Sequence, residues 1–152
     1  MTTPDQVYKT HIDSTPEKVW AAITNPEFSR QYFFSSALIT PDWKKGSAFQ
    51  MKNMDNGDVV HEGEILECDP PRLLVLSWRN PGDMSDVSRV RYEIVAKGSG
   101  VELTIMHGDF IENSPMATRV AGGWPTIIAN LKAYLETGVV AGPKTSGGSC
   151  AA

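Results

Sequence analysis

Two histidines have neighbours that would place them in an apolar pocket, where an imidazole can serve as a polar anchor or as a general acid or base. His107 follows Leu103 and Ile105 at a spacing of two residues, and His61 precedes Ile65 by four. Side chains two residues apart on a strand point to the same face, so each histidine should share the face of its apolar neighbours. Burial there would lower the imidazole pKa and keep the ring neutral. A lone histidine on an apolar face is more often a hydrogen-bonded core residue, and that alternative stays open.

The segment His61-Glu62-Gly63-Glu64 is the first place to look for a metal ion. In the HExxH zinc motif a second histidine would stand where this chain has Ile65, and a strand would place His61 and Glu62 on opposite faces. The two cysteines are far apart and make no CxxC pair. We therefore expect neither a metal ion nor another cofactor.

No pattern assigns a catalytic nucleophile or a phosphate site. The chain has no GxSxG elbow, and its one Gly-Ser-Gly stretch is too short for a phosphate-binding loop. Asp109 follows His107 by two residues and could orient it if the strand continued that far, although an aspartate at a strand end is more often a turn former. We name no catalytic residue, and binding is favoured over catalysis.

Composition describes an ordinary globular protein of one domain. Apolar residues make up 41% and charged residues 21% of the 152 positions. The net charge of −4 and the scattered Lys and Arg offer no surface for nucleic acid. No window approaches the roughly 20 apolar residues that span a bilayer, and the first ten residues lack a signal-peptide core. We expect a cytoplasmic protein without membrane contact.

The cysteines and the C-terminal composition favour the same compartment. Cys68 lies in an expected strand, whereas Cys150 lies in a Gly/Ser-rich end, so a disulfide would tie the core to an unstructured segment. A reducing compartment fits better, with Cys68 as a small buried apolar residue. Residues 1–140 should form a single domain, and residues 141–152 a disordered tail.

The N-terminal third has first the alternating pattern of a strand and then the start signals and spacing of two short helices. Residues 6–12 alternate as a strand does, after which Ser14 and Glu17 have capping-box spacing with a proline between them. A short helix should run from there to about Thr24. Asn25 and Pro26 repeat the start signal, so a second short helix should end near the aromatic patch Tyr32-Phe33-Phe34.

Residues 48–109 are patterned as a meander of antiparallel strands. The pair Asn56-Gly57 predicts a hairpin turn, and Asp69-Pro70-Pro71 stops the strand that follows it. Leu74, Leu76 and Trp78 alternate on one strand, and later strands carry Tyr92 and His107.

A long amphipathic helix closes the chain. Its apolar residues recur at offsets of three and four, and a C-cap glycine follows at Gly138. Gly122-Gly123 and Pro125 predict a kink or break, so that the regular helix begins near Trp124. The apolar stripe consists of Val120, Trp124, Ile127, Ile128, Leu131 and Leu135.

This order of elements predicts an α+β helix-grip fold, in which a curved antiparallel sheet wraps one long C-terminal helix. The chain resembles the START-like (SRPBCC) superfamily, and within it proteins similar to the C-terminal domain of the heat-shock chaperone ATPase activator. The likeness spans residues 6–138. It is carried by Thr15-Pro16-Glu17-Lys18-Val19-Trp20, Asn25-Pro26-Glu27, Gly63-Glu64-Ile65, Asp69-Pro70-Pro71-Arg72-Leu73-Leu74, Trp78, residues 100–107, Gly123-Trp124 and Leu131-Lys132-Ala133-Tyr134-Leu135.

The resemblance implies an apolar cavity between sheet and helix. Binding of a small hydrophobic or aromatic molecule is the leading hypothesis. A polyketide-cyclase-like enzyme using His107 or His61, with Tyr92 as a proton donor, is the second. A chaperone-associated protein of the stress response is the third, although the activator has a separate N-terminal chaperone-binding domain and this chain begins with the first strand of the grip. A homodimer through sheet edges or the aromatic patch is possible. The residues expected to line the cavity are Phe49, His61, Trp78, Tyr92, His107, Trp124 and Ile128.

Overall fold

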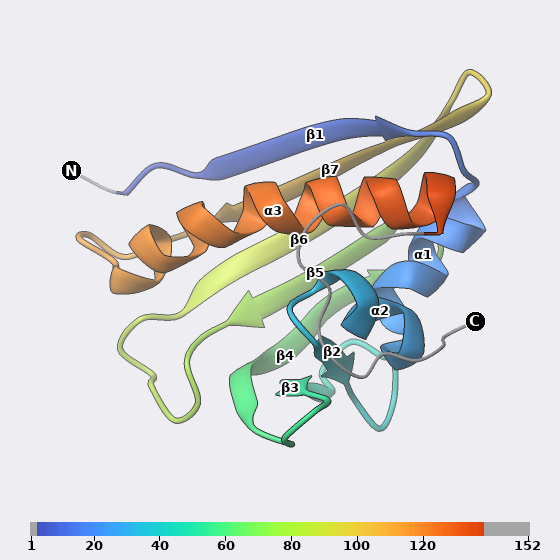
Figure 1. The fold of residues 1–152 in the computed structure, drawn as a ribbon. Helices are drawn as coiled ribbons and strands as arrows, with labels where there is room; N and C mark the ends of the chain where they lie inside the picture. The colour runs from blue at the N-terminus through green and yellow to red at the C-terminus, as the bar shows by residue number, and fades with distance from the viewer. Residues whose placement is uncertain (1–2, 139–152) are drawn as a thin grey trace.

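The computed structural model describes residues 3–138, which form a seven-stranded antiparallel sheet and three helices (Figure 1). The strands lie in the order β1-β7-β6-β5-β4-β3-β2, so the meander of neighbouring strands is closed on one side by β1. The α+β helix-grip prediction is confirmed. The elements are β1 (Gln6–Ile12), α1 (Pro16–Thr24), α2 (Pro26–Tyr32), β2 (Ser36–Ile39), β3 (Ala48–Asn53), β4 (Val59–Asp69), β5 (Leu73–Trp78), β6 (Ser88–Lys97), β7 (Gly100–Gly108) and α3 (Pro115–Thr137).

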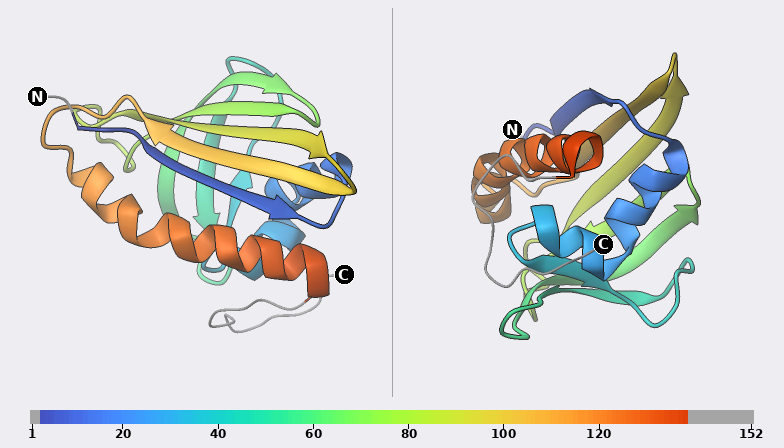
Figure 2. Two further views of the ribbon diagram at one scale, coloured as in Figure 1. Left: turned by 90° about the horizontal axis from the view of Figure 1, so that it is seen from above. Right: turned by 45° about the vertical axis from the view of Figure 1, so that its right-hand side comes forward.

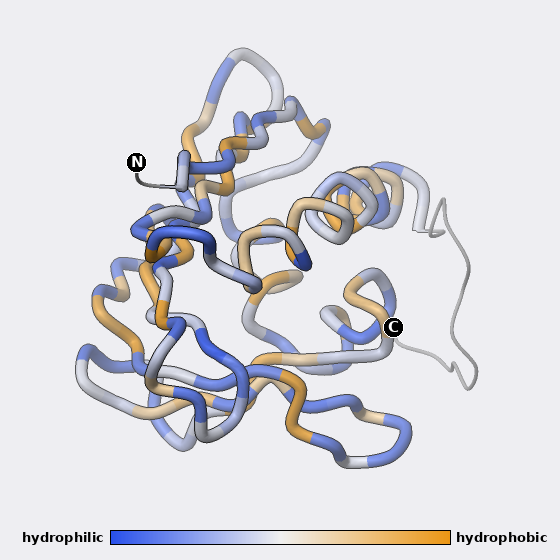
Figure 3. The backbone as a smooth tube through the Cα atoms, turned by 90° about the vertical axis from the view of Figure 1, so that its left-hand side faces the viewer, coloured by the Kyte–Doolittle hydropathy of each residue, from blue (hydrophilic) through white to orange (hydrophobic). Residues whose placement is uncertain are grey.

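The sheet is strongly curved, and α3 runs along its concave side with α1 and α2 beside it (Figure 2). The core lies between this face and the helices, and alternation of apolar and polar residues follows the strands (Figure 3). Trp78 and Trp124 are the largest side chains that are fully buried. Within residues 3–138, no helix is both long and apolar enough to cross a membrane.

The two short helices begin at threonine and asparagine caps. Asn25 Oδ1 accepts the N–H of Glu27 at 3.0 Å, as its position before Pro26 predicts. The cap of α1 is Thr15, whose Oγ1 accepts the N–H of Lys18 at 3.2 Å. The prediction of a cap at Ser14 was therefore wrong by one residue, because two adjacent hydroxyl residues can each fill this role.

The long helix starts earlier than its glycines and proline predicted. α3 begins at Pro115 and continues through Gly122, Gly123 and Pro125, so the prediction of a regular helix starting near Trp124 was wrong. Packing against β1, α1 and α2 compensates for poor helix formers in the middle. The predicted C-cap is confirmed, since Gly138 has a φ of 80° and its N–H bonds to Tyr134.

A buried aspartate fixes the N-terminus of α3. The N-cap hydroxyl of Ser114 donates to Asp86 Oδ1 at 2.7 Å, and the N–H of Met116 donates to Asp86 Oδ2 at 2.9 Å. Asp86 is 4% exposed and lies in the loop between β5 and β6. This loop therefore holds the end of the helix that lies over the sheet.

One strand was not predicted. β2 has only four residues, and three of them are buried, so it shows no alternation to recognise. It pairs with β3 at the end of the sheet, with Leu38 opposite Met51. Residues 141–152, predicted as a disordered tail, and Cys150 lie outside the described residues. Cys68 is half-buried rather than buried and forms no disulfide within residues 3–138.

Candidate functional site

A cavity of about 200 Å³ lies between α3, the strands β4 and β5, and the segment that joins α2 to β2. Its walls are almost entirely apolar, and Arg119 is the one residue with a permanent charge in the lining. The lining residues are Phe33, Phe34, His61, Trp78, Arg119, Val120, Gly123, Trp124 and Ile127.

Aromatic rings form the floor and one side of this cavity. Trp78 from the sheet and Trp124 from α3 lie with ring centroids 6.1 Å apart, and both are nearly inaccessible to solvent. Phe33 meets Trp124 edge to face at 5.8 Å and 87°. Such a set of ring faces and edges is suited to hold a flat apolar molecule.

Close approach of β4 and β5 brings His61 against Trp78. A Cβ on Gly63 would lie 2.1 Å from the backbone oxygen of Ser77, so only glycine fits there. Two residues before this glycine, the His61 ring lies 4.9 Å from the Trp78 ring between centroids, at an angle of 32°. The glycine in the Gly63-Glu64-Ile65 motif is therefore required by the geometry of the cavity wall.

The polar atoms of these two rings lack partners. Among the described residues, neither ring nitrogen of His61 nor Nε1 of Trp78 makes a hydrogen bond, although all three atoms are buried. Burial, and secondly the Arg119 guanidinium, lower the pKa of His61 to about 4. His61 is thus a neutral imidazole at neutral pH, with one donor and one acceptor unused.

His107 lies behind the cavity in a complete hydrogen-bond chain. Trp124 Nε1 donates to His107 Nδ1 at 3.0 Å, which assigns the ring proton to Nε2. Nε2 then donates to Ser88 Oγ at 2.7 Å, and Ser88 donates to the backbone oxygen of Trp78 at 3.1 Å. Burial, with a smaller contribution from His61, lowers the pKa of His107 to about 3. Both nitrogens are occupied, which fits the hydrogen-bonded core alternative.

The other expected lining residues lie next to the cavity. Phe49 is buried behind Trp78, and Tyr92 is buried behind Trp124, with ring centroids 5.9 Å and 6.2 Å apart. Burial raises the pKa of the Tyr92 hydroxyl, which makes it a poor proton donor. Ile128 is half-buried outside the lining. Of the seven residues predicted for the cavity, the structure places His61, Trp78 and Trp124 in its wall.

Asp109 does not orient His107. β7 ends at Gly108, and Asp109 has a φ of 56° and is exposed, with its carboxylate 3.3 Å from Arg89. A residue with positive φ leaves the strand, so the expected pairing on one face is lost.

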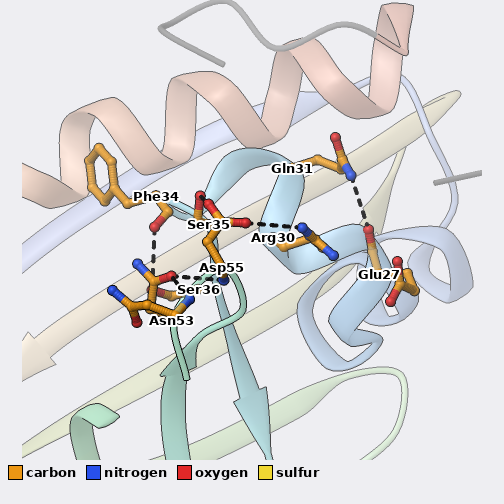
Figure 4. Close-up of polar contacts among 9 residues, drawn as sticks. Glu27, Arg30, Gln31, Phe34, Ser35, Ser36, Asn53 and Asp55 are labelled. Carbon is orange, nitrogen blue, oxygen red and sulfur yellow. Dashed lines mark hydrogen bonds and ion pairs between the residues drawn. The ribbon is translucent and has the colours of Figure 1, made fainter. Parts of the chain in front are cut away.

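The aromatic patch supplies the mouth of the cavity, which the sequence did not indicate. Phe34 and Ser35 have φ values of 50° and 63°, so the chain turns sharply after α2. Ser35 Oγ donates to Asp55 at 2.8 Å, and Arg30 pairs with the same carboxylate at 3.2 Å (Figure 4). The Phe34 side chain lies beside α3 and is 51% exposed. A Cβ added to Gly123 would lie 3.9 Å from it.

Four further lining residues were not predicted. Val120 and Ile127 belong to the apolar stripe expected for α3, whereas Arg119 and Gly123 carry no signal of their own. Arg119 and Gly123 lie one turn apart on α3, on the face toward the cavity. They could be identified only from where α3 begins and from how the helix is rotated about its axis relative to the sheet.

The grip of a curved sheet on one long helix, with an apolar cavity between them, defines a START-like protein. The chain belongs to the activator of Hsp90 ATPase homolog 1-like protein family, whose model matches residues 13–136. A search of curated proteins gave no match.

Solved structures with the same fold come from several organisms. The crystal structure of CalU16 from Micromonospora echinospora has a TM-score of 0.65 and 25% identity, covering 84% of this chain and 76% of that chain. The Aha1 dimer from Colwellia psychrerythraea has a TM-score of 0.70 and 14% identity, and the match covers 90% of this chain and 98% of that chain. An HSP90 activator from Plasmodium falciparum has a TM-score of 0.71 and 19% identity, and the match covers 88% of this chain and 96% of that chain.

Proposed function

We propose that this chain binds a small hydrophobic or aromatic molecule in the cavity between the sheet and α3. The observation that carries the proposal is a cavity of about 200 Å³ walled by Phe33, Trp78 and Trp124. Its walls are almost entirely apolar, as the walls of pockets for small apolar molecules usually are.

The size of the cavity limits the ligand. An apolar cavity of about 150 Å³ holds benzene, so a somewhat larger one has room for a substituted ring or two fused rings. Pockets for drug-sized molecules are larger, at roughly 300–1,000 Å³. A steroid or a long polyketide would need the walls to move, whereas a one- or two-ring aromatic molecule would not.

The hydrogen bonds favour binding over the cyclase-like alternative. A general base needs a free lone pair near the reacting atom. His107 Nδ1 accepts from Trp124, and Tyr92 lies buried outside the lining. His61 keeps a free lone pair, but a pKa of about 4 makes it a weak base. Contact with a ligand is therefore the role that suits these residues.

Two glycines on α3 provide a matched test of this proposal. Gly123 lines the cavity mouth, whereas a Cβ on Gly122 would meet nothing within 4 Å. Both substitutions to leucine should stabilise the helix by similar amounts, because glycine is a poor helix former. Indole serves as the probe, with calorimetry and the shift in melting temperature as readouts.

We expect Gly122→Leu to bind indole as the wild type does, and Gly123→Leu to lose binding by at least about tenfold because its side chain fills the mouth. Equal binding by all three proteins would place the probe elsewhere and contradict the proposal. Absence of binding to the wild type would do the same, because ligand at 100 times its Kd should stabilise the fold by about 2.7 kcal/mol.

Association with a chaperone is a second candidate, and the family match is the observation that favours it. The Plasmodium falciparum relative is described as an HSP90 activator. Addition of the purified chain to an Hsp90-type chaperone should then raise its ATPase rate, and an unchanged rate would count against this candidate.

A further inference from the structure

The cavity has one charged residue at its rim. Arg119 belongs to the lining and is exposed, so this residue stands where the apolar cavity meets solvent. An arginine is always protonated in proteins, and its planar group can donate two parallel hydrogen bonds to a carboxylate.

No acidic group of the described residues neutralises this charge. The contact made by Arg119 is a hydrogen bond of 3.0 Å from Nη1 to the neutral Asn80 side chain, and within residues 3–138 it takes part in no ion pair. The neighbouring Arg79 differs, because Glu62 lies 2.8 Å from it. The Gly82 N–H, and then Arg79, hold the pKa of Glu62 below its usual value, so that carboxylate is committed to Arg79.

The charge of Arg119 reaches the cavity wall. Its guanidinium contributes to the lowered pKa of His61, which lines the same cavity. The apolar surroundings weaken solvent screening on that side. A positive rim and aromatic walls together match a flat ring that carries a negative charge.

We propose that the ligand is an aromatic monoanion, with its ring between Trp78, Trp124 and Phe33 and its carboxylate or phenolate on Arg119. This inference rests on the proposed function, since it names the chemical class of the molecule that occupies the same cavity. The anion would bond the guanidinium at the rim, where water can still reach it, so the ring alone has to enter the apolar space.

Two compounds of the same shape separate the charge from the ring. 2-Naphthoate and 2-naphthamide differ in charge at neutral pH, and both carry the same two fused rings. Their dissociation constants are measured by calorimetry for the wild type and for Arg119→Gln, Arg119→Lys and Arg72→Gln. Arg72 is an exposed arginine outside the cavity, paired with Asp69, and serves as the matched control.

We expect the wild type and Arg72→Gln to bind 2-naphthoate about tenfold more tightly than 2-naphthamide, which corresponds to about 1.4 kcal/mol. Arg119→Gln should remove this preference by weakening 2-naphthoate binding about tenfold more than 2-naphthamide binding, and Arg119→Lys should keep part of the preference. Equal affinity of the wild type for both compounds, or an unchanged preference in Arg119→Gln, would overturn the inference and leave cavity binding intact. Failure of both compounds to bind would overturn the proposed function itself.

Discussion

Trp124 on α3 donates its indole N–H to His107 on β7, with 3.0 Å between the two nitrogen atoms. The bond ties the helix wall of the cavity to the sheet and occupies the lone pair that His107 would need to act as a base. His61 lies 4.9 Å from Trp78 between ring centroids, and neither of its nitrogens bonds to any of residues 3–138. We therefore expect the two histidines to differ in what they contribute to stability.

Replacement of His107 should be costly. His107→Leu would leave the buried Trp124 N–H without its acceptor and the Ser88 oxygen without the donor at Nε2, which should lower the free energy of unfolding by about 2–4 kcal/mol. Denaturant unfolding of the two proteins measures the difference. A change below about 1 kcal/mol would show that the hydrogen-bond chain contributes little.

Replacement of His61 should not be costly. His61→Leu removes two buried nitrogens that have no partner within the described part of the chain, and it keeps an apolar side chain against Trp78. We expect the free energy of unfolding at neutral pH to stay the same or to rise by up to about 1 kcal/mol. A loss comparable to that of His107→Leu would mean that His61 has partners that this account leaves out.

Both histidines should make the protein sensitive to acid. Their pKa values in the fold, about 4 for His61 and about 3 for His107, lie below the ordinary value of 6.5. The unfolded chain therefore binds more protons as the pH falls below 6.5, so stability decreases on acidification until each folded pKa is reached. Each group contributes a slope of up to about 1.4 kcal/mol per pH unit.

The contribution of His61 can be isolated by comparison with His61→Leu. The carboxylates that titrate in this range are common to both proteins, so the difference in stability between them reports on His61. This difference should grow in favour of the variant between pH 6.5 and 4 and stay constant below pH 4, where His61 is protonated in the folded protein as well. Unfolding curves at several pH values measure it. A difference that does not change with pH would indicate that His61 titrates normally in the fold.

The aspartate that caps α3 should support both stability and binding. Asp86→Ala removes the acceptor for Ser114 and Met116, and should lower the free energy of unfolding by about 1–2 kcal/mol. Indole affinity should fall with it, because this end of α3 carries Arg119 and Val120. Asp83→Ala, in the same loop, is the control. Equal effects of the two substitutions would exclude a specific capping role.

The backbone of Phe34, in the sharp turn after α2, should be strained, and this conformation places the Phe34 ring at the cavity mouth. A left-handed backbone costs an ordinary residue about 1–2 kcal/mol, and glycine adopts it without that cost. Phe34→Gly should therefore be more stable than Phe34→Ala by about 1 kcal/mol, while both bind indole more weakly than the wild type. Thermal unfolding and calorimetry test this. Wild-type affinity in both variants would show that the Phe34 ring is not part of the site.

The fold could be predicted because every strand and helix except β2 carries a local signal. Alternation, the Asn25 cap and Gly138 each depend on a few neighbouring residues. Predictions from neighbouring residues failed where tertiary packing determines the secondary structure. Gly122, Gly123 and Pro125 stay helical because α3 lies on the sheet, and β2 is too short to alternate.

The cavity wall could be predicted only in part. His61, Trp78 and Trp124 follow from strand and helix faces, but a face cannot tell a lining residue from one behind it, which is why Phe49 and His107 were grouped with them. Arg119 and Phe34 enter the site through the rotation of α3 and a turn with positive φ. Neither feature is encoded in a sequence pattern.

The most direct test of the central claim is an isotope-filtered NOE experiment with unlabelled indole and the labelled protein. Binding in the cavity predicts contacts from indole protons to the Ile127 methyl groups and to the rings of Trp78, Trp124 and Phe34, with none to the exposed Val95 on β6. Contacts that occur only at exposed positions such as Val95, or no contacts at saturating indole, would contradict the account.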